Sequence, residues 1–357
     1  MSGASSGHDP TVWDRELVVQ VVEAESILEE HATYATSLRG EKRFTEGTTL
    51  AYVTPWNGHG YEVAKTFRGK FDLLSPTWFQ IPWKEEGKEW KVEGGHDVDV
   101  DWMLEVRTNE TGRIVPRFSF QGWTLPQYQT LIEGTDQMAI KGIAQVILEE
   151  VEDHGFDGVT LECAAIHALG GLLDLLGTRL HEQGKLLILV LPPYREDQAY
   201  PFTPGWLKKW DEQVDYYSIM TYDYSLANGP GPNAPIRWME EAVETLVGRS
   251  PNSDQRAKVL LGLNFYGYAF HVMDARAEAV INTQYLGILE QFFPVFRWDR
   301  SSKESCAEYT LPTGETREVW YPTLKSIAAR VDLARELGVG VSIWEIGQGL
   351  DYFYDLI

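Results

Sequence analysis

Strand-like and helix-like segments alternate along most of the chain, and this alternation constrains the fold more than any other feature of the sequence. Short apolar runs typical of strands occupy residues 49–53, 73–81, 114–120, 156–164, 186–191, 214–220, 259–263 and 339–344. Segments with apolar residues at helical spacing lie between several of them, including residues 140–153, 168–182 and 324–337. Eight strands separated by helices predict a (β/α)8 TIM barrel. The length of 357 residues suits one such barrel with insertions.

Two parts of the chain fall outside this alternation. Roughly sixty residues separate the seventh strand from the last helix, which is too many for a plain connection. Short alternating pieces and a helix-like piece at 283–293 lie in this range, so we expect a small α+β insertion at residues 264–322. Apolar residues recur at helical spacing between Leu17 and Leu28, which predicts an amphipathic helix in an N-terminal extension, residues 1–46. The barrel domain is then expected to cover residues 47–357.

The fourth predicted strand carries side chains of two alternating kinds. The apolar ones are Val159, Leu161 and Cys163, and those between them are Thr160, Glu162 and Ala164. Because successive side chains of a strand point to opposite faces, the second set shares one face. In a closed parallel barrel the apolar face of a strand packs against the helices and the other face points into the barrel. The strand runs toward the C-terminal end of the barrel, where the active sites of barrel enzymes lie. Glu162 is therefore expected near the floor of a site.

This stretch resembles the fourth-strand signature DGxDxDxE of glycoside hydrolase family 18, the chitinases and chitinase-like lectins. Asp157 and Gly158 match the signature. Thr160 and Glu162 stand at its two inner Asp positions, and Ala164 stands at its final Glu. The resemblance implies substrate-assisted hydrolysis, in which that Glu protonates the glycosidic oxygen and the sugar's own N-acetyl oxygen attacks. Alanine has no proton to donate, and general acid catalysis contributes roughly 10²–10⁴-fold, so we expect no catalytic acid and no ordinary chitinase activity.

Motifs at the ends of other strands resemble sugar-binding residues of the same family. The sixth strand ends in an MTYD-type motif, whose Tyr-Asp pair contacts the acetamido group and ring of the sugar in that family. The eighth ends in Trp344, which resembles the family's floor Trp, and alternation points the next residue, Glu345, away from that face. The third and seventh strands end in pieces similar to the SxGGW and GxPxYG motifs, with Gln121 and Asn264 as departures. The ligand-binding residues that the resemblance implies are Tyr52, Trp56, Phe120, Glu162, Met220, Tyr222, Asp223, Tyr266 and Trp344.

The chain especially resembles one branch of the family, a lectin type of saccharide-binding protein that also lacks the acid Glu. Residues 52–57 and 340–345 are among the runs that carry this finer resemblance. The branch implies a secreted or lysosomal location and an oligosaccharide of the N-acetylglucosamine type as the ligand. A receptor or sorting protein is an additional partner that this resemblance allows. The polar residues 1–7 show no signal peptide and are typical of a flexible leader, whereas the sequon at Asn109 is compatible with secretion.

Composition argues against several classes of partner and cofactor. The net charge of −22 disfavours nucleic acids and anionic membranes, which bind clustered Lys and Arg. The longest apolar run, residues 186–191, is far too short to span a bilayer, so no membrane insertion is expected. No Cys/His cluster indicates a metal, and no cofactor is expected. The two cysteines, Cys163 and Cys306, cannot define a disulfide framework, and a bond between them stays open.

Three functions remain open on this basis. The first is a chitinase-like lectin that binds chitooligosaccharides or related N-acetylated glycans, with hydrolysis impaired because Ala164 stands at the acid position. The second is an active glycosidase of the family that uses a displaced acid, Glu162 or Asp223. The third is a scaffold whose barrel binds a protein partner.

Overall fold

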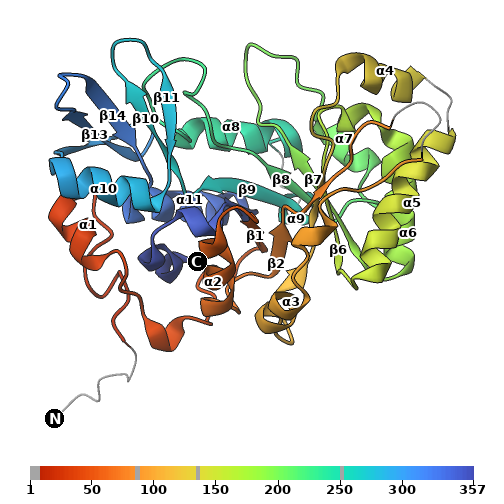
Figure 1. Ribbon diagram of the computed structural model, residues 1–357, viewed down its shortest axis with the longest axis horizontal. Helices are drawn as coiled ribbons and strands as arrows, with labels where there is room; N and C mark the ends of the chain where they lie inside the picture. Colours follow the sequence, from red (N-terminus) through yellow and green to blue (C-terminus); the bar gives the residue numbers. More distant parts are fainter. Residues whose placement is uncertain (1–8, 85–88, 134–136, 250–252) are drawn as a thin grey trace.

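The computed structural model of the protein describes residues 9–84, 89–133, 137–249 and 253–357 (Figure 1). A ten-stranded parallel sheet forms its centre, in the order β3-β5-β6-β7-β8-β9-β15-β1-β2-β4. Its strands are β1 (Thr49–Val53), β2 (Leu73–Pro76), β3 (Phe79–Gln80), β4 (Arg113–Ile114), β5 (Arg117–Ser119), β6 (Gly158–Glu162), β7 (Leu186–Leu191), β8 (Tyr216–Ile219), β9 (Val259–Asn264) and β15 (Gly340–Trp344). Most of their side chains are buried, as expected of parallel strands that are covered on both faces.

The sheet closes on itself because its two ends come from the same two stretches of chain. β2 and β3 are pieces of one run, residues 73–80, and β4 and β5 are pieces of the next, residues 113–119. β2 pairs with β4 and β3 pairs with β5, so the second and third barrel strands pair in two steps. The predicted (β/α)8 barrel is confirmed, but the prediction of uninterrupted strands at 73–81 and 114–120 is wrong. Pro76 and Pro116 stand at the two breaks, and proline has no N–H to continue a ladder.

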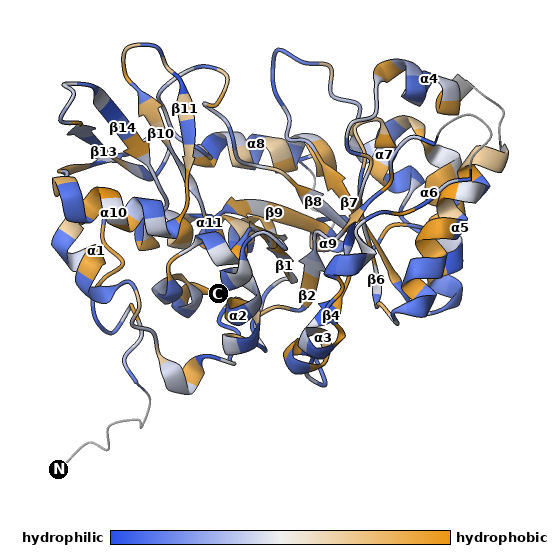
Figure 2. Ribbon diagram, viewed as in Figure 1, coloured by the Kyte–Doolittle hydropathy of each residue, from blue (hydrophilic) through white to orange (hydrophobic). Residues whose placement is uncertain are grey.

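Helices cover the outside of the barrel. They are α2 (Gly58–Thr66), α3 (Val100–Val106), α4 (Leu125–Glu133), α5 (Gln137–Asp153), α6 (Gly170–Glu182), α7 (Pro204–Lys209), α8 (Ile236–Val247), α9 (Ser253–Ala257) and α11 (Leu324–Leu337). Hydrophobic residues concentrate along the central strands, whereas the helices alternate hydrophobic and hydrophilic stretches (Figure 2). Val159 and Leu161 of β6 are fully buried in one cluster with Ile143, Ile147 and Leu172, so the apolar face of the fourth strand meets the helices as predicted.

Asp157 and Gly158 hold the start of β6 in place. The Asp157 carboxylate accepts hydrogen bonds from the Ile114 N–H at 2.7 Å and from the Arg107 guanidinium at 2.8 Å. A Cβ on Gly158 would lie 2.4 Å from the carbonyl oxygen of Leu186, so β6 and β7 can approach this closely only at a glycine. These contacts set the register that carries the other end of β6 to the mouth of the barrel.

A second sheet, which is antiparallel, lies beside the barrel (Figure 1). Its strands fall between β9 and α11 in the chain. Its strand order is β11-β10-β14-β13-β12. The elements of this insertion are β10 (Gly267–His271), β11 (Ala277–Val280), α10 (Asn282–Phe292), β12 (Phe296–Asp299), β13 (Glu304–Thr310) and β14 (Thr316–Trp320). The predicted α+β insertion is therefore confirmed, and all of these elements lie within residues 264–322.

The N-terminal extension contains a shorter helix than the sequence predicts. α1 (Ala24–Glu30) begins only after the valine-rich residues 17–22, which are not helical, so the prediction of a helix starting at residue 17 is wrong. β-branched side chains lose rotamer freedom in a helix, which explains why this stretch stays outside α1 despite its apolar spacing. α1 packs against α10 of the insertion. Asp355 accepts the N–H groups of Val12 and Ala35 at 3.0 Å each, which ties the extension to the outside of the barrel.

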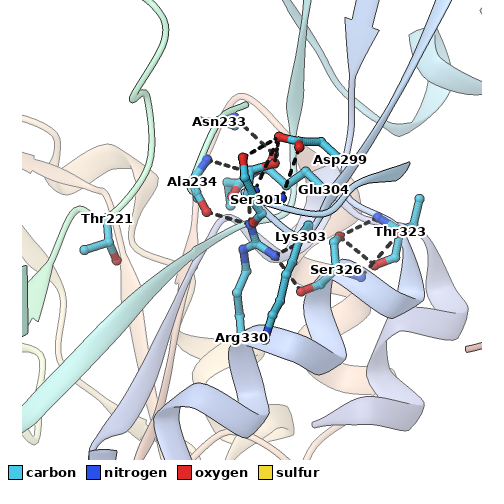
Figure 3. A network of polar contacts seen from close by, with 12 residues as sticks. Thr221, Asn233, Ala234, Asp299, Ser301, Lys303, Glu304, Thr323, Ser326 and Arg330 are labelled. Atoms are coloured by element: carbon cyan, nitrogen blue, oxygen red, sulfur yellow. Dashed lines mark hydrogen bonds and ion pairs between the residues drawn. The ribbon is translucent and has the colours of Figure 1, made fainter. Parts of the chain in front are cut away.

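A buried ion pair joins the insertion to the barrel (Figure 3). Arg330 on α11 donates to the carboxylate of Glu304 on β13 at 3.0 Å. It also donates to the carbonyl oxygens of Ala234 at 2.6 Å and of Ser302 at 3.2 Å. Burial raises the pKa of Glu304 and lowers that of Arg330, and the charge of each partner opposes the effect on the other.

Replacing Arg330 by methionine should destabilise the protein by about 3–5 kcal/mol, because Glu304 would remain buried without its partner. Urea unfolding followed by circular dichroism measures the loss. The control is Arg179→Met on α6, which breaks an exposed ion pair with Glu182 and should cost less than about 1 kcal/mol. Equal losses in the two variants would contradict the role given to the buried pair.

Candidate functional site

The C-terminal ends of the barrel strands surround a cavity of about 440 Å³. Residues singled out by the sequence that line it are Trp56, Phe120, Glu162, Ala164 and Trp344. They come from the ends of β1, β5, β6 and β15 or from the loops that follow, so the barrel gathers positions that are far apart in the chain. This is the edge of the barrel at which the sequence analysis expects a site.

Ala164 and Glu162 both line this cavity, and Cys163 between them is buried, as the alternation predicts. β6 ends at Glu162, however, so Ala164 lies in the turn that follows and not in the strand itself. Ala164 is exposed, whereas Glu162 is half-buried. The wall of the cavity beside Glu162 is therefore a methyl group and not a second carboxyl group.

Glu162 is held by Arg117 of the neighbouring strand β5. The Nη1 atom of Arg117 lies 2.7 Å from the Oε2 atom of Glu162, and its guanidinium carbon lies 5.5 Å from the centre of the Trp344 ring. In the register of β5 and β6, Arg117 stands opposite Thr160 and Ser119 stands opposite Glu162, which puts Arg117 on the inward face. No sequence motif marks Arg117, although the alternation of side chains along β5 indicates its inward face. In this pair the Glu162 carboxylate is a hydrogen-bond acceptor.

Trp344 rests on Tyr52 at the floor of the cavity. Their ring centres lie 5.1 Å apart with a tilt of 56°. Tyr52 is buried and its hydroxyl donates to the Oγ atom of Ser218 at 2.9 Å, so it supports Trp344 from inside the barrel and does not line the cavity. Burial raises the pKa of Tyr52, which keeps its hydroxyl protonated at neutral pH. Met220 is half-buried and packs against the same interior cluster as Trp344.

Two further aromatic residues that line the cavity, Trp56 and Phe120, have different degrees of exposure. Trp56 is 68% exposed at the rim. Phe120, which the family resemblance implies as a ligand-binding residue, is only 4% exposed, and its ring centre lies 4.7 Å from that of Trp123. The indole N–H of Trp123 donates to the carbonyl oxygen of Ile81 at 2.7 Å, which orients the Trp123 ring along the cavity wall. Phe120 thus acts mainly as packing beneath Trp123.

Asp223 follows β8 and is held through both its side chain and its backbone. Its Oδ1 atom accepts hydrogen bonds from the hydroxyls of Tyr266 and Tyr268, the second at 2.8 Å. Its N–H donates to the Oδ1 atom of Asn233 at 2.6 Å. Its φ of 63° lies in the left-handed region, which few residues other than glycine adopt. Tyr266 and Asp223 are predicted site residues. Tyr268 and Asn233 are not, because only the docking of the insertion and of the next loop brings these two side chains to Asp223.

The charges of Asp223 and Glu162 both act on the buried hydroxyl of Tyr222. Asp223 lines a second hollow of about 670 Å³, beside Arg195 and Trp238, and not the cavity around Glu162. Tyr222 is buried, and burial raises the pKa of its hydroxyl well above the ordinary value, with the nearby carboxylates of Asp223 and Glu162 raising it further. Tyr222 therefore stays neutral and keeps a hydroxyl that can donate a hydrogen bond.

Glu345 follows Trp344 in the chain but does not line the cavity, as alternation predicts. It is fully buried and accepts hydrogen bonds from the side-chain amide of Asn57 at 2.5 Å and from the Gly347 N–H at 3.0 Å. Burial raises the pKa of its carboxyl group to about 7, although the two hydrogen bonds and the nearby His59 oppose the rise.

The two cysteines are both buried and free, so the disulfide bond that the sequence leaves open is not formed. Within residues 9–84, 89–133, 137–249 and 253–357, no three His, Cys, Asp or Glu side chains gather closely enough to hold a metal ion. Of the helices in the described part of the chain, none combines the length and the apolar character that crossing a bilayer requires.

The chain is similar in sequence to one family of glycosyl hydrolases and to lytic enzymes of Bacillus species. The sequence profile of the family described as glycosyl hydrolases family 18 matches residues 105–349. The cortical fragment-lytic enzyme of Bacillus subtilis is 29% identical over 143 residues, which make up 38% of this chain and 32% of that enzyme. The enzyme of the same name from Bacillus anthracis is 25% identical over 214 residues, or 56% of this chain and 49% of the relative. The chain thus spans about half the length, or less, of these curated relatives.

Solved structures share the fold. A chitinase from Chromobacterium violaceum superimposes with a TM-score of 0.72 at 22% identity, covering 87% of this chain and 97% of the chitinase. The spore cortex-lytic enzyme SleL of Bacillus cereus superimposes with a TM-score of 0.71 at 18% identity, covering 87% of this chain and 73% of the enzyme. At these identities the likeness shows the fold alone.

Between about pH 4.5 and pH 7 the protein should lose stability as the pH rises, because the folded state binds the Glu345 proton more tightly than the unfolded chain does. Glu345→Gln removes this titration. The fall in unfolding free energy between about pH 5 and pH 8 should therefore shrink by roughly 2–3 kcal/mol in the variant, as measured by urea unfolding. Near pH 5 the wild-type carboxyl group is protonated. A difference in unfolding free energy between variant and wild type at that pH therefore reports the altered hydrogen bonds and not the titration. A pH dependence equal to that of the wild type would exclude Glu345 as the titrating group.

Proposed function

Because the chain belongs to glycosyl hydrolase family 18, whose profile matches residues 105–349, we propose that it is a chitinase-like carbohydrate-binding protein of the lectin type. It holds chitooligosaccharides or related N-acetylated glycans at the mouth of the barrel without cleaving them. The observation that carries this proposal is the exposed Ala164 at the family's acid position, beside a Glu162 that Arg117 engages. The site then offers room for a sugar but no group that protonates its glycosidic oxygen.

Aromatic and polar groups around the cavity support the sugar-binding part of the proposal. Trp344 at the floor and Trp56 at the rim both present ring surface to the cavity, and each stacked sugar would gain roughly 0.5–1.5 kcal/mol by analogy with aromatic pairs. Glu162 supplies an acceptor in the cavity, and Asp223 supplies one in the second hollow; the acetamido group and ring hydroxyls of a sugar require such acceptors. A neutral sugar is also compatible with the net charge of −22.

The second candidate is an active glycosidase with a displaced acid. The relatives' names favour it, since the Bacillus proteins are called lytic enzymes and one structural neighbour is called a chitinase. The contacts of the two candidate acids argue against it. Glu162 accepts a hydrogen bond from Arg117 through Oε2, and Asp223 accepts two from tyrosine hydroxyls through Oδ1, so one oxygen of each group is already engaged as an acceptor.

The same proposal assigns the chain to one branch of the family. On the runs at residues 52–57 and 340–345, we place the chain in the branch of chitinase domain-containing protein 1, also called stabilin-interacting chitinase-like protein. A secreted or lysosomal location follows from that branch, with a receptor or sorting protein as a further partner. Recovery of the protein from the medium or the lysosomal fraction of cells that make it supports this location, and recovery from the cytosol alone would contradict it.

The unaltered protein should bind an N-acetylglucosamine tetramer in calorimetry and release no chromophore from a chromogenic N-acetylglucosamine oligomer. Ala164→Glu should retain the binding and gain turnover, up to roughly 10²–10⁴-fold over the unaltered protein, because it restores the general acid. The matched control is Ala164→Gln, which adds a side chain of nearly the same size at the same position but no acid proton, and should gain no turnover.

Two outcomes of these assays decide against the lectin. Turnover by the unaltered protein that disappears in Glu162→Gln would favour the displaced acid. A glycan array and calorimetry that both detect no bound sugar would favour the third function, a scaffold for a protein partner.

A further inference from the structure

The loop between β8 and α8 reaches the site through Asn233. The side-chain Oδ1 atom of Asn233 accepts a hydrogen bond from the Asp223 N–H at 2.6 Å. The backbone carbonyl oxygen of Asn233 accepts one from the Tyr224 N–H at 2.9 Å. The side chain is 2% exposed, and its Nδ2 atom is buried with no hydrogen-bond partner among the described residues. The amide group therefore serves here through its oxygen alone, as an acceptor for Asp223.

The ion pair between the insertion and α11 holds this loop in turn (Figure 3). The Glu304 carboxylate accepts the Asn233 N–H at 3.0 Å through Oε2 and the Ala234 N–H at 2.9 Å through Oε1. Arg330 donates to the same Oε1 atom at 3.0 Å and to the Ala234 carbonyl oxygen at 2.6 Å. Buried charges thus anchor two successive peptide groups of the loop, which leaves Asn233 little freedom to shift.

The backbone of Asp223 needs such an anchor. Its φ of 63° is unfavourable for a residue with a Cβ, and conformations of this kind persist only where the surroundings hold them. Tyr266 and Tyr268 hold its carboxylate, and Asn233 holds its N–H. An aspartate at position 233 would accept the same hydrogen bond but would bury a further carboxylate beside Glu304, which explains why an amide stands here.

We propose that Asn233 is a positioning residue of the glycan site that acts through Asp223, and that the buried pair of Glu304 and Arg330 sets its place. This inference rests on the proposed function, since it gives Asp223 a part in sugar binding. The insertion then contributes to binding twice, through the tyrosine hydroxyls that orient the Asp223 carboxylate and through the glutamate that anchors the loop. Sugar affinity is thereby coupled to the docking of the insertion on the barrel.

Asn233→Ala removes the acceptor for the Asp223 N–H and keeps the backbone contacts of Glu304. It should weaken the binding of an N-acetylglucosamine tetramer by roughly 3- to 10-fold in calorimetry, the effect of one lost hydrogen bond. In the Asp223→Ala background the same change should cost no further affinity, because Asn233 acts only through Asp223. The control is Thr323→Ala, which removes the N-cap of α11 in the same region (Figure 3), lowers stability and should leave the affinity unchanged.

An unchanged affinity in Asn233→Ala, or equal losses with and without the Asp223 side chain, would overturn the inference. A crystal structure of Asn233→Ala provides a second readout that needs no sugar. In it Asp223 should leave its left-handed conformation and lose the hydrogen bonds from the two tyrosines, and an Asp223 that keeps both would overturn the inference. If the unaltered protein binds no sugar, the proposed function fails, and the conformation of Asp223 in this crystal structure still decides the positioning role.

Discussion

The alternation of inward and outward side chains in a closed barrel is the constraint on which the rest of this structure depends. The inward residues form a cluster of their own, made of Leu50, Tyr52, Leu73, Val115, Ile188, Val190 and Leu260, whereas the outward ones pack under the helices. Because the barrel has no free edge, a shift of one residue in any strand would exchange its two faces. The same alternation brings Glu162 of β6 and Trp344 of β15 into the cavity at the mouth, so the site is a consequence of the register.

Polar groups inside the barrel are few, and the contacts among them give the site its chemical character. The hydroxyls of Tyr52, Ser218 and Ser342 form a hydrogen-bonded chain across the interior, with links of 2.9 and 3.0 Å. Above it, Arg117 and Glu162 form an ion pair, and removing either partner would leave the other charge poorly compensated in a half-buried place. This pairing turns Glu162 into an acceptor at the floor of the cavity. A carboxylate with that role suits the orientation of a bound sugar better than proton transfer to it.

The insertion belongs to the site, because it supplies contacts that the barrel lacks. The hydroxyls of Tyr268 on β10 and of Tyr266 just before it converge on Asp223. The Glu304–Arg330 pair ties β13 to α11 and to the loop after β8. The N-terminal extension packs against α10 on the outer side of the same insertion. The chain thus holds the insertion between the extension and the barrel, which fixes the distance between the tyrosines and the barrel mouth.

The sequence by itself determined the number and order of the barrel strands, the inward face of the fourth strand and the lack of a carboxyl group at position 164. These features depend on neighbours a few residues apart, which periodicity and motif spacing report directly. Local spacing failed at residues 17–22, where valines oppose a helix, and at the breaks beside Pro76 and Pro116. Only the tertiary structure decided which side chains meet: Arg117 and Glu162 are 45 positions apart, Asp223 and Tyr268 also 45, and Asn233 and Glu304 71. The physical reason is that the period of a strand sets the face of a side chain, whereas strand register and the docking of loops set what lies across from it.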